Sequence, residues 1–274
     1  MISTYNLNNY APFPMDEILN GFERITLDEM SDIRLMNRTD TKFVTTIERL
    51  KELLVMAQPE YRIQEVDALR NIPYYTMYFD TESFDMYCEH SHGHTNRQKV
   101  RIRSYVNSNL NFLEVKTKDN HGRTKKKRIS MHNFTPSEPN CNGFDCEDDE
   151  KALYFHFLQQ HLKYAPERLS PAVENKFNRI TLVNNRKTER LTIDTDLQFC
   201  NKTTGKAFAF DGIAIIELKR DGLEFSPVTA MLNALRIKPH GFSKYCLGSA
   251  MTNADLPLNK FKARLRAIEK LKEL

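Results

Sequence analysis

The sequence predicts an α+β fold in which about eight antiparallel strands curl into a tunnel or barrel with a charged interior, flanked by helices. Three observations lead to this prediction. Strand-like segments joined by short polar turns make up most of the chain, charged residues recur at every second position within them, and helical patterns gather towards the C-terminus. Of the 274 residues, 40% are hydrophobic and 28% are charged, so the chain can bury a core.

The start of the chain is predicted to be irregular. Residues 1–26 contain Asn and Pro and few periodic apolar residues, which indicates an irregular lead-in with at most one short helix near residues 15–22. Residues 27–274 are predicted to form a single domain that includes the C-terminal helices. Length alone leaves one or two domains open, because a domain typically has roughly 150 residues.

The predicted elements follow in order. A strand at 33–44 leads into a helix at 47–57, for which Thr45 or Thr46 offers an N-cap. Further strands are predicted at 74–80, 100–106, 111–117, 123–131, 172–182, 189–196, 207–210 and 213–219. Further helices are predicted at 150–164, 227–235, 244–251 and 258–274.

Charged residues recur at alternate positions within these strands. Because alternate residues of a strand point to the same face, such charges lie side by side. The intervening positions, such as Ile102 and Leu113, are apolar, so each strand has one charged and one apolar face. The charged sets are Arg38, Asp40 and Lys42; Arg101 and Arg103; Glu114 and Lys116; Lys126 and Arg128; Arg190 and Asp194; Glu217 and Lys219.

Two arrangements explain this pattern. For one strand alone, the simpler interpretation is a half-buried sheet whose charged face meets water. Repetition over six strands favours closure of the sheet with the charges inward. Enclosed cations are stable only when anions neutralise them, so the expected ligand is a polyanion with many phosphates. Arg and Lys together bind phosphate oxygens well. Glu217, with Glu114 or Asp194, could hold Mg²⁺ or Mn²⁺ shared with phosphate oxygens.

Nine short motifs carry a resemblance to a known family. They are NRTDTKF at 37–43, YFDT at 78–81, RIR at 101–103, EVKTK at 114–118, KKR at 126–128, P…NKFNR at 171–179, RLTIDTDLQF at 190–199, IIELK at 215–219 and FSKY at 242–245. From about residue 27 to residue 247, the chain resembles the VTC-type polyphosphate polymerase domain of the CYTH, or triphosphate tunnel metalloenzyme, superfamily. The resemblance implies an antiparallel β tunnel that transfers the γ-phosphate of ATP onto a polyphosphate chain with a divalent metal.

The resemblance also implies roles for individual residues. The residues expected to act on the transferred phosphate are Arg101, Arg103, Lys116, Arg190, Lys219 and Lys244. The residues expected to bind substrate phosphates are Lys42, Lys126, Arg179, Ser243 and Arg38. Glu217 is expected to hold Mn²⁺ or Mg²⁺, with Glu114 as a further ligand. ATP and polyphosphate are the expected partners, and delivery of the product across a membrane would require another, membrane-associated protein.

Two positions depart from the patterns of related proteins. Phe177 stands where family members commonly have Tyr, so one hydroxyl contact is missing. Hydrolase relatives carry a paired-glutamate ExExK motif on the first strand, whereas this chain has Arg38, Asp40 and Lys42. Fewer carboxylates give weaker support for a second metal that would activate water, which favours polymerase over hydrolase. Hydrolysis of inorganic or nucleoside triphosphates and non-catalytic polyphosphate binding stay open as alternatives.

Other signals are weaker. The net charge of +4 gives no reason to expect a nucleic-acid-binding protein. A cytoplasmic location is predicted, because no apolar run approaches the ~20 residues of a membrane span and no signal peptide is evident. The HSHGH tract at 90–94 is interpreted as a solvated loop rather than a metal site. The amphipathic C-terminal helix is expected to pack over the barrel rather than on a membrane. The oligomeric state is left open.

Overall fold

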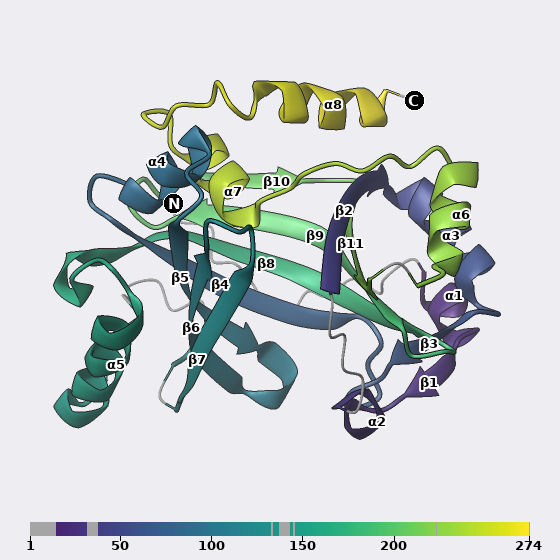
Figure 1. Cartoon of the computed structure of the whole chain (residues 1–274), viewed down its shortest axis with the longest axis horizontal. Helices are drawn as coiled ribbons and strands as arrows, with labels where there is room; N and C mark the ends of the chain where they lie inside the picture. Colours follow the sequence, from purple (N-terminus) through teal and green to yellow (C-terminus); the bar gives the residue numbers. More distant parts are fainter. Residues whose placement is uncertain are drawn as a thin grey trace.

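The computed structural model describes residues 15–31, 38–132, 134–136, 143–144, 146–222 and 224–273. Within these ranges the chain has the predicted α+β fold, with one large sheet that carries helices on its surfaces (Figure 1). The pairing is antiparallel except between β1 (Glu23–Ile25) and β3 (Tyr61–Gln64). The part of the chain that the structure describes contains no helix long and apolar enough to span a membrane.

Eight strands follow one another across the sheet in the order β2-β11-β9-β8-β4-β5-β6-β7. Their bounds are β2 (Arg38–Thr46), β4 (Ile72–Thr81), β5 (Arg97–Tyr105), β6 (Leu110–Lys118), β7 (Thr124–Met131), β8 (Leu169–Asn184), β9 (Glu189–Asn201) and β11 (Ile213–Asp221). At the margins, β3 pairs with β8 and β10 (Ala207–Phe210) pairs with β9. The predicted strands are therefore present, although residues 33–37 of the first lie outside the described residues.

The helices flank the sheet as expected. They are α1 (Asp16–Asn20), α2 (Leu27–Ser31), α3 (Ile47–Ala57), α4 (Asp85–His92), α5 (Asp148–His161), α6 (Pro227–Ala234), α7 (Lys244–Thr252) and α8 (Lys262–Lys272), with short 3₁₀ turns η1 (Val106–Ser108) and η2 (Pro166–Arg168). The hydroxyl of Thr46 accepts a hydrogen bond from the Arg49 amide at 3.3 Å. This confirms Thr46, rather than Thr45, as the cap that begins α3.

Four segments differ from the sequence prediction, and the first is the helix α2, which was not predicted. Residues 16–25, expected to be irregular apart from a short helix, contain both α1 and β1. The strand β3 was not predicted, because four residues give too little periodicity. The prediction that the HSHGH tract is a loop is wrong for residues 90–92, because α4 continues to His92. The helix ends at Gly93, which has a φ of 80°. The division of the chain at residue 27 stays a prediction.

The outer face of the sheet carries the apolar residues that lie between the charges. Leu191, Ile193, Ile216 and Leu218 pack under α1, α3 and α6. On the other half of the same face, four apolar side chains of β5 and β6 pack under α5: Val100, Ile102, Leu113 and Val115. Figure 1 shows these two groups of helices at opposite ends of the sheet. The charged positions therefore face the opposite way, towards the inner face.

Within the residues that the structure describes, the sheet curls around its inner face but does not close. In a flat sheet, the five strand spacings from β11 to β6 would separate Glu217 and Lys116 by about 24 Å. The negative charge of Glu217 nevertheless reaches Lys116, where it opposes the lowering of that lysine's pKa, so the two strands must face each other across a curled sheet. Among the described residues, β2 and β7 are not paired with each other, so the prediction of a closed barrel is wrong. β7 is exposed almost throughout and rich in Lys, a composition that disfavours pairing at an edge.

One end of the inner face is apolar and is filled by α7. Tyr245 and Leu247 of α7 share a buried cluster with Leu197 and Phe199 of β9. α7 approaches β9 so closely that a Cβ atom added at Gly248 would lie 2.3 Å from the ring of Phe199. The predicted packing of the C-terminal helix over the barrel is confirmed, because three residues of α8 belong to the same cluster: Leu265, Ile268 and Leu271. The remaining, charged end of the inner face is the candidate site.

Candidate active site

The charged end of the inner face is built by strand periodicity. Arg101 and Arg103 stand two residues apart on β5, opposite Glu114 and Phe112 of β6. On the far side of β6, Lys116 pairs in register with Lys126 of β7. We define the inner cluster as the cations that share this face: Lys42, Arg101, Arg103, Lys116, Lys126, Arg179, Arg190, Lys219 and Lys244. Three carboxylates lie among them, and each is held by two cations.

Glu114 is the first of these carboxylates. Arg101 donates to its Oε2 atom through Nε at 2.7 Å and lies 2.6 Å away through Nη2, while Lys126 Nζ lies 3.2 Å from Oε1. Burial alone would raise the pKa of Glu114, but the charges of Arg101, Arg103 and Lys126 lower it below its usual value. Glu114 is therefore an anion that fixes the direction of the Arg101 guanidinium.

Asp194 is the second carboxylate and joins the sheet to α7. Arg179 of β8 holds it in a bidentate pair, with Nε 2.6 Å from Oδ1 and Nη2 2.8 Å from Oδ2. Lys244, the first residue of α7, lies 2.5 Å from Oδ2. Burial opposes ionisation of Asp194, but these two cations lower the pKa below its usual value. The pairing places the start of α7 over the site.

Glu217 is the third carboxylate and lies on β11. Lys42 Nζ lies 2.6 Å from its Oε1 atom, and Lys219 pairs with Oε2. Burial would raise the pKa of Glu217, but the two lysines lower it below its usual value. Glu217 is the most open of the three carboxylates, because 22% of its side chain is exposed, against 1% for Glu114 and 8% for Asp194.

Two cations of the inner cluster have no carboxylate of their own. Within the described residues, Arg103 and Lys116 form no ion pair, and Arg103 Nε has no hydrogen-bond partner. Burial and the neighbouring Arg101 and Arg179 lower the pKa of Arg103 to about 10. The pKa of Lys116 falls well below its usual value, chiefly because of Arg101 and then because of burial. The site therefore has an excess of positive charge that a polyanion would neutralise.

An aromatic floor supports several of these cations. The rings of Tyr74 and Phe177 stack with centroids 5.3 Å apart. Arg179 lies 5.0 Å from the Tyr74 centroid, and Lys244 Nζ lies 3.0 Å from that of Phe177. The Phe177 ring thus supports two cations of the inner cluster, Arg179 and Lys244. Sequence reasoning missed this role, because the contact joins β8 to α7.

The remaining predicted residues lie near this centre with different exposures. Arg190 is half-buried and stands opposite Lys219 in the β9–β11 register. Ser243 caps α7 by accepting from the Cys246 amide, and it also accepts from Lys99 at 2.9 Å. Lys126 is on the rim, since 43% of its side chain is exposed. The side chain of Arg38 lies outside the described residues.

Sequence reasoning also missed Lys99 and Asp80. Lys99 continues the two-residue spacing of Arg101 and Arg103 on β5, so its signal was present. Asp80 accepts hydrogen bonds from the amides of Met86 and Tyr87 at 2.9 Å and from the hydroxyl of Tyr245. Asp80 thereby ties α4 to α7, one residue away from Lys244. Only its place in the YFDT motif hinted at importance.

The site fits a divalent metal only in part. The described residues contain no group of three or more His, Cys, Asp or Glu side chains able to hold one. A metal bound through one carboxylate and substrate phosphates needs no such group, because Mg²⁺ commonly keeps waters and phosphate oxygens as its other ligands. The openness of Glu217 suits that role better than the enclosed position of Glu114. Both assignments stay predictions.

Comparison with known proteins identifies the family. A profile of the VTC domain matches residues 37–253. This chain belongs to the VTC domain family. The match starts ten residues later and ends six residues later than the resemblance seen in the motifs. It contains all eight central strands, because β2 begins at Arg38 and β11 ends at Asp221. Membership supports a polyphosphate-related or triphosphate-related function for this VTC domain.

Solved structures with similar folds share little sequence with the VTC domain. A proposed adenylyl cyclase from Hippeastrum, described as having a dominant triphosphatase activity, is 14% identical with a TM-score of 0.48, over 81% of this chain and 99% of its own. A proposed adenylate cyclase from Vibrio parahaemolyticus is 10% identical with a TM-score of 0.44, over 78% and 99%. No curated protein matches the chain.

Proposed function

We propose that this VTC domain is a metal-dependent phosphotransferase that moves the γ-phosphate of ATP onto a polyphosphate chain. The observation that carries the proposal is the excess of enclosed cations over carboxylates at one end of the inner face, above all Arg103 and Lys116. Phosphoryl transfer requires positioning and charge neutralisation more than covalent catalysis, and a cationic enclosed site supplies both.

The reaction follows from the placement of these groups. A terminal oxygen of the acceptor chain attacks the γ-phosphorus of ATP in line, and the bond to the β–γ bridging oxygen breaks to release ADP. Arg103 and Lys116 neutralise the equatorial oxygens, because no protein carboxylate competes for them among the described residues. Arg101, Arg179 and Lys244 are oriented by Glu114 and Asp194 and position the phosphates. A divalent metal held by Glu217 would supply further charge neutralisation.

The arrangement of the carboxylates supports transfer over hydrolysis. A hydrolase needs a group that activates water, often a second metal held by carboxylates. Here each of the three enclosed carboxylates is held by two cations, as described for Glu114, Asp194 and Glu217. Transfer to a phosphate acceptor needs no such water, because the acceptor oxygen is already an anion.

Incubation of the purified protein with ATP, a short polyphosphate primer and Mn²⁺ tests the proposal. We expect longer polyphosphate on a gel, with one ADP released for each phosphate added. Release of inorganic phosphate without chain growth would instead indicate a triphosphate hydrolase. Tight polyphosphate binding with no ATP turnover would indicate a non-catalytic binder.

Two variants test the residues. Arg103→Ala is expected to lower kcat by about 100-fold or more, the usual loss when one stabilising donor is removed from a transition state. Glu217→Ala is expected to raise the Mn²⁺ concentration needed for half-maximal rate. Lys187→Ala, an exposed change in the β8–β9 turn, is the matched control. Wild-type kcat in Arg103→Ala, or an unchanged Mn²⁺ requirement in Glu217→Ala, would show that the residue does not have the proposed role.

A further inference from the structure

The cations of β5 do not stop at the candidate active site. Residues 97, 99, 101 and 103 are all Arg or Lys and share the inner face of the strand. At about 3.4 Å per residue, this row is about 20 Å long, which is longer than a triphosphate group. The two residues at its outer end, Arg97 and Lys99, stand opposite Lys118 and Lys116 of β6. The basic row is therefore doubled across two strands.

A further cation reaches this end of the row from α8. A Cβ atom added at Gly241 would lie 3.5 Å from the Arg264 guanidinium carbon, which places Arg264 against the segment that leads into α7. Two residues later, Ser243 accepts a hydrogen bond from Lys99 at 2.9 Å. We define the outer cluster as Arg97, Lys99, Lys118 and Arg264. Ser243 is its point of contact with the inner cluster.

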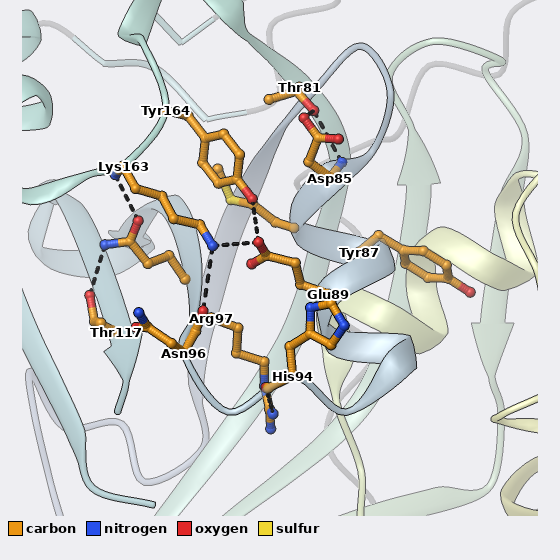
Figure 2. A network of polar contacts seen from close by, with 12 residues as sticks. Thr81, Asp85, Tyr87, Glu89, His94, Asn96, Arg97, Thr117, Lys163 and Tyr164 are labelled. Atoms are coloured by element: carbon orange, nitrogen blue, oxygen red, sulfur yellow. Dashed lines mark hydrogen bonds and ion pairs between the residues drawn. The ribbon is translucent and has the colours of Figure 1, made fainter. Parts of the chain in front are cut away.

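The outer cluster differs from the inner one in that no carboxylate of the described residues forms an ion pair with it. The nearby carboxylates are committed elsewhere. Glu89 pairs with Lys163 and accepts from the Tyr164 hydroxyl at 2.8 Å, as Figure 2 shows. Asp119 accepts from the amides of its own hairpin, those of His121 and Arg123.

The surroundings hold the outer cluster in place. Arg97 donates to the carbonyl of His94 at 2.5 Å, at the turn between α4 and β5 (Figure 2). Gln98, on the opposite face of the strand, donates to Thr117 and to the carbonyl of His161. His90 lies among the outer cations, and burial together with Lys99 and Arg97 lowers its pKa to about 2, so it adds no positive charge at neutral pH. These cations are thus pre-positioned, which favours binding of an anion.

We propose that the outer cluster is a second phosphate-binding site, continuous with the first through Ser243, which binds the part of a polyphosphate chain that extends beyond the reacting triphosphate. The inference rests on the proposed function, because it takes the inner cluster as the place of reaction. It assigns the substrate class more narrowly: chains long enough to reach both clusters bind more tightly than tripolyphosphate. The absence of ion-pairing carboxylates among the described residues suits a stretch of chain that is only held, with no group to be oriented for chemistry.

Binding measurements with two probes test this assignment. The test variant is the triple substitution Arg97→Gln, Lys118→Gln and Arg264→Gln, which leaves Lys99 and the inner cluster unchanged. We expect it to weaken binding of long-chain polyphosphate by at least tenfold and binding of tripolyphosphate by less than twofold, as measured by isothermal titration calorimetry. The control is Lys151→Gln, Arg186→Gln and Lys206→Gln, three exposed cations whose removal lowers the net charge equally.

The outcomes separate a local site from a general charge effect. Equal weakening for the two probes, or equal weakening in the control variant, would overturn the second site. Tighter binding of a single-stranded RNA oligonucleotide than of long-chain polyphosphate would also overturn it. Failure of the wild type to turn over ATP would refute the proposed catalysis, while the comparison of the two probes would still decide the outer cluster. The single variant Arg264→Gln, on an exposed side chain, repeats the test if the triple variant does not fold.

Discussion

Each end of the inner face contains a buried carboxylate, and the two carboxylates have different kinds of partner. At the charged end, Glu114 lies between Arg101 and Lys126, and its pKa is lowered. At the apolar end, Asp80 is as deeply buried but is held by amides and the Tyr245 hydroxyl, and burial raises its pKa. The difference shows that the type of partner, rather than the depth of burial, decides the direction of the pKa shift.

α7 is the element that joins the two ends. Its first residue, Lys244, pairs with Asp194 at the charged end, and the next residue, Tyr245, donates to Asp80 at the apolar end. Burial and the nearby Arg179 lower the pKa of Lys244 well below its usual value, while Asp194 opposes this shift. The apolar packing of α7 thereby holds a cation where other cations repel it. Stability at one end therefore fixes the position of Lys244 at the other.

The largest effect is expected at the charged end. Arg101→Ala leaves Glu114 enclosed with only the rim residue Lys126, and breaking such a buried pair costs about 3–5 kcal/mol. Urea denaturation measures the loss. Lys127→Ala, an exposed change on β7, is the control and should shift stability by less than about 0.5 kcal/mol.

A second substitution sharpens the explanation of that loss. If the uncompensated carboxylate is the cause, Arg101→Ala combined with Glu114→Gln should be less destabilised than Arg101→Ala alone. If the loss in free energy of unfolding in the double variant equals the sum of the losses in the two single variants, Glu114 is not an anion that depends on Arg101.

At the apolar end, Gly248→Ala is expected to destabilise the protein by about 1–3 kcal/mol, the usual range for overpacking. The added methyl would overlap the ring of Phe199 and push α7 away from β9. Because α7 carries Lys244, tripolyphosphate binding should weaken together with stability. Thermal unfolding and calorimetry give the two readouts, and Phe199→Leu should restore both. Loss of stability with unchanged tripolyphosphate binding would mean that the packing of α7 at the apolar end does not influence the charged end.

Acid should affect the two ends in opposite directions. Glu114, Asp194 and Glu217 have pKa values below their usual ones, so their stabilisation is present at neutral pH and is lost as the pH falls below about 4 towards the lowered values. The raised pKa of Asp80 has the reverse sign, since its protonation on acidification favours the folded state. Free energies of unfolding measured across this range should flatten in Asp194→Asn and steepen in Asp80→Asn. The same slope in all three proteins would refute the assignment.

The smallest effect is expected at the aromatic floor. Phe177→Leu removes the ring beneath Lys244 and Arg179, a loss of about 0.5–2 kcal/mol, so tripolyphosphate affinity should fall severalfold. Phe177→Tyr keeps the ring and restores the family's hydroxyl, so affinity should be at least that of the wild type. Weaker binding by the Tyr variant than by the Leu variant would mean that the ring is not the support.

The strands, and the shared face of most candidate site residues, could be predicted from the sequence because their signal is local. Alternation places Arg101 and Arg103 on one face whatever the strand packs against, and the caps and turns of α3 lie within a few residues. Elements without a local signal were missed. β3 is too short to show periodicity, and α4 has no capping side chain at its N-cap residue, Phe84. The amides of Met86 and Tyr87 instead donate to Asp80, which lies six and seven residues before them, beyond the spacing of an ordinary cap.

The sequence alone therefore predicted that one face of each strand is charged and that a polyanion would suit that face. Three features depended on the assembled sheet: that those faces meet each other, which cations hold each carboxylate and, within the described residues, that the sheet stays open between β2 and β7. The physical reason is range: periodicity is a property of neighbours along the chain, whereas charge pairing depends on atoms that only curling brings within a few ångströms. The partners of Asp194, fifteen and fifty residues away, are the clearest case.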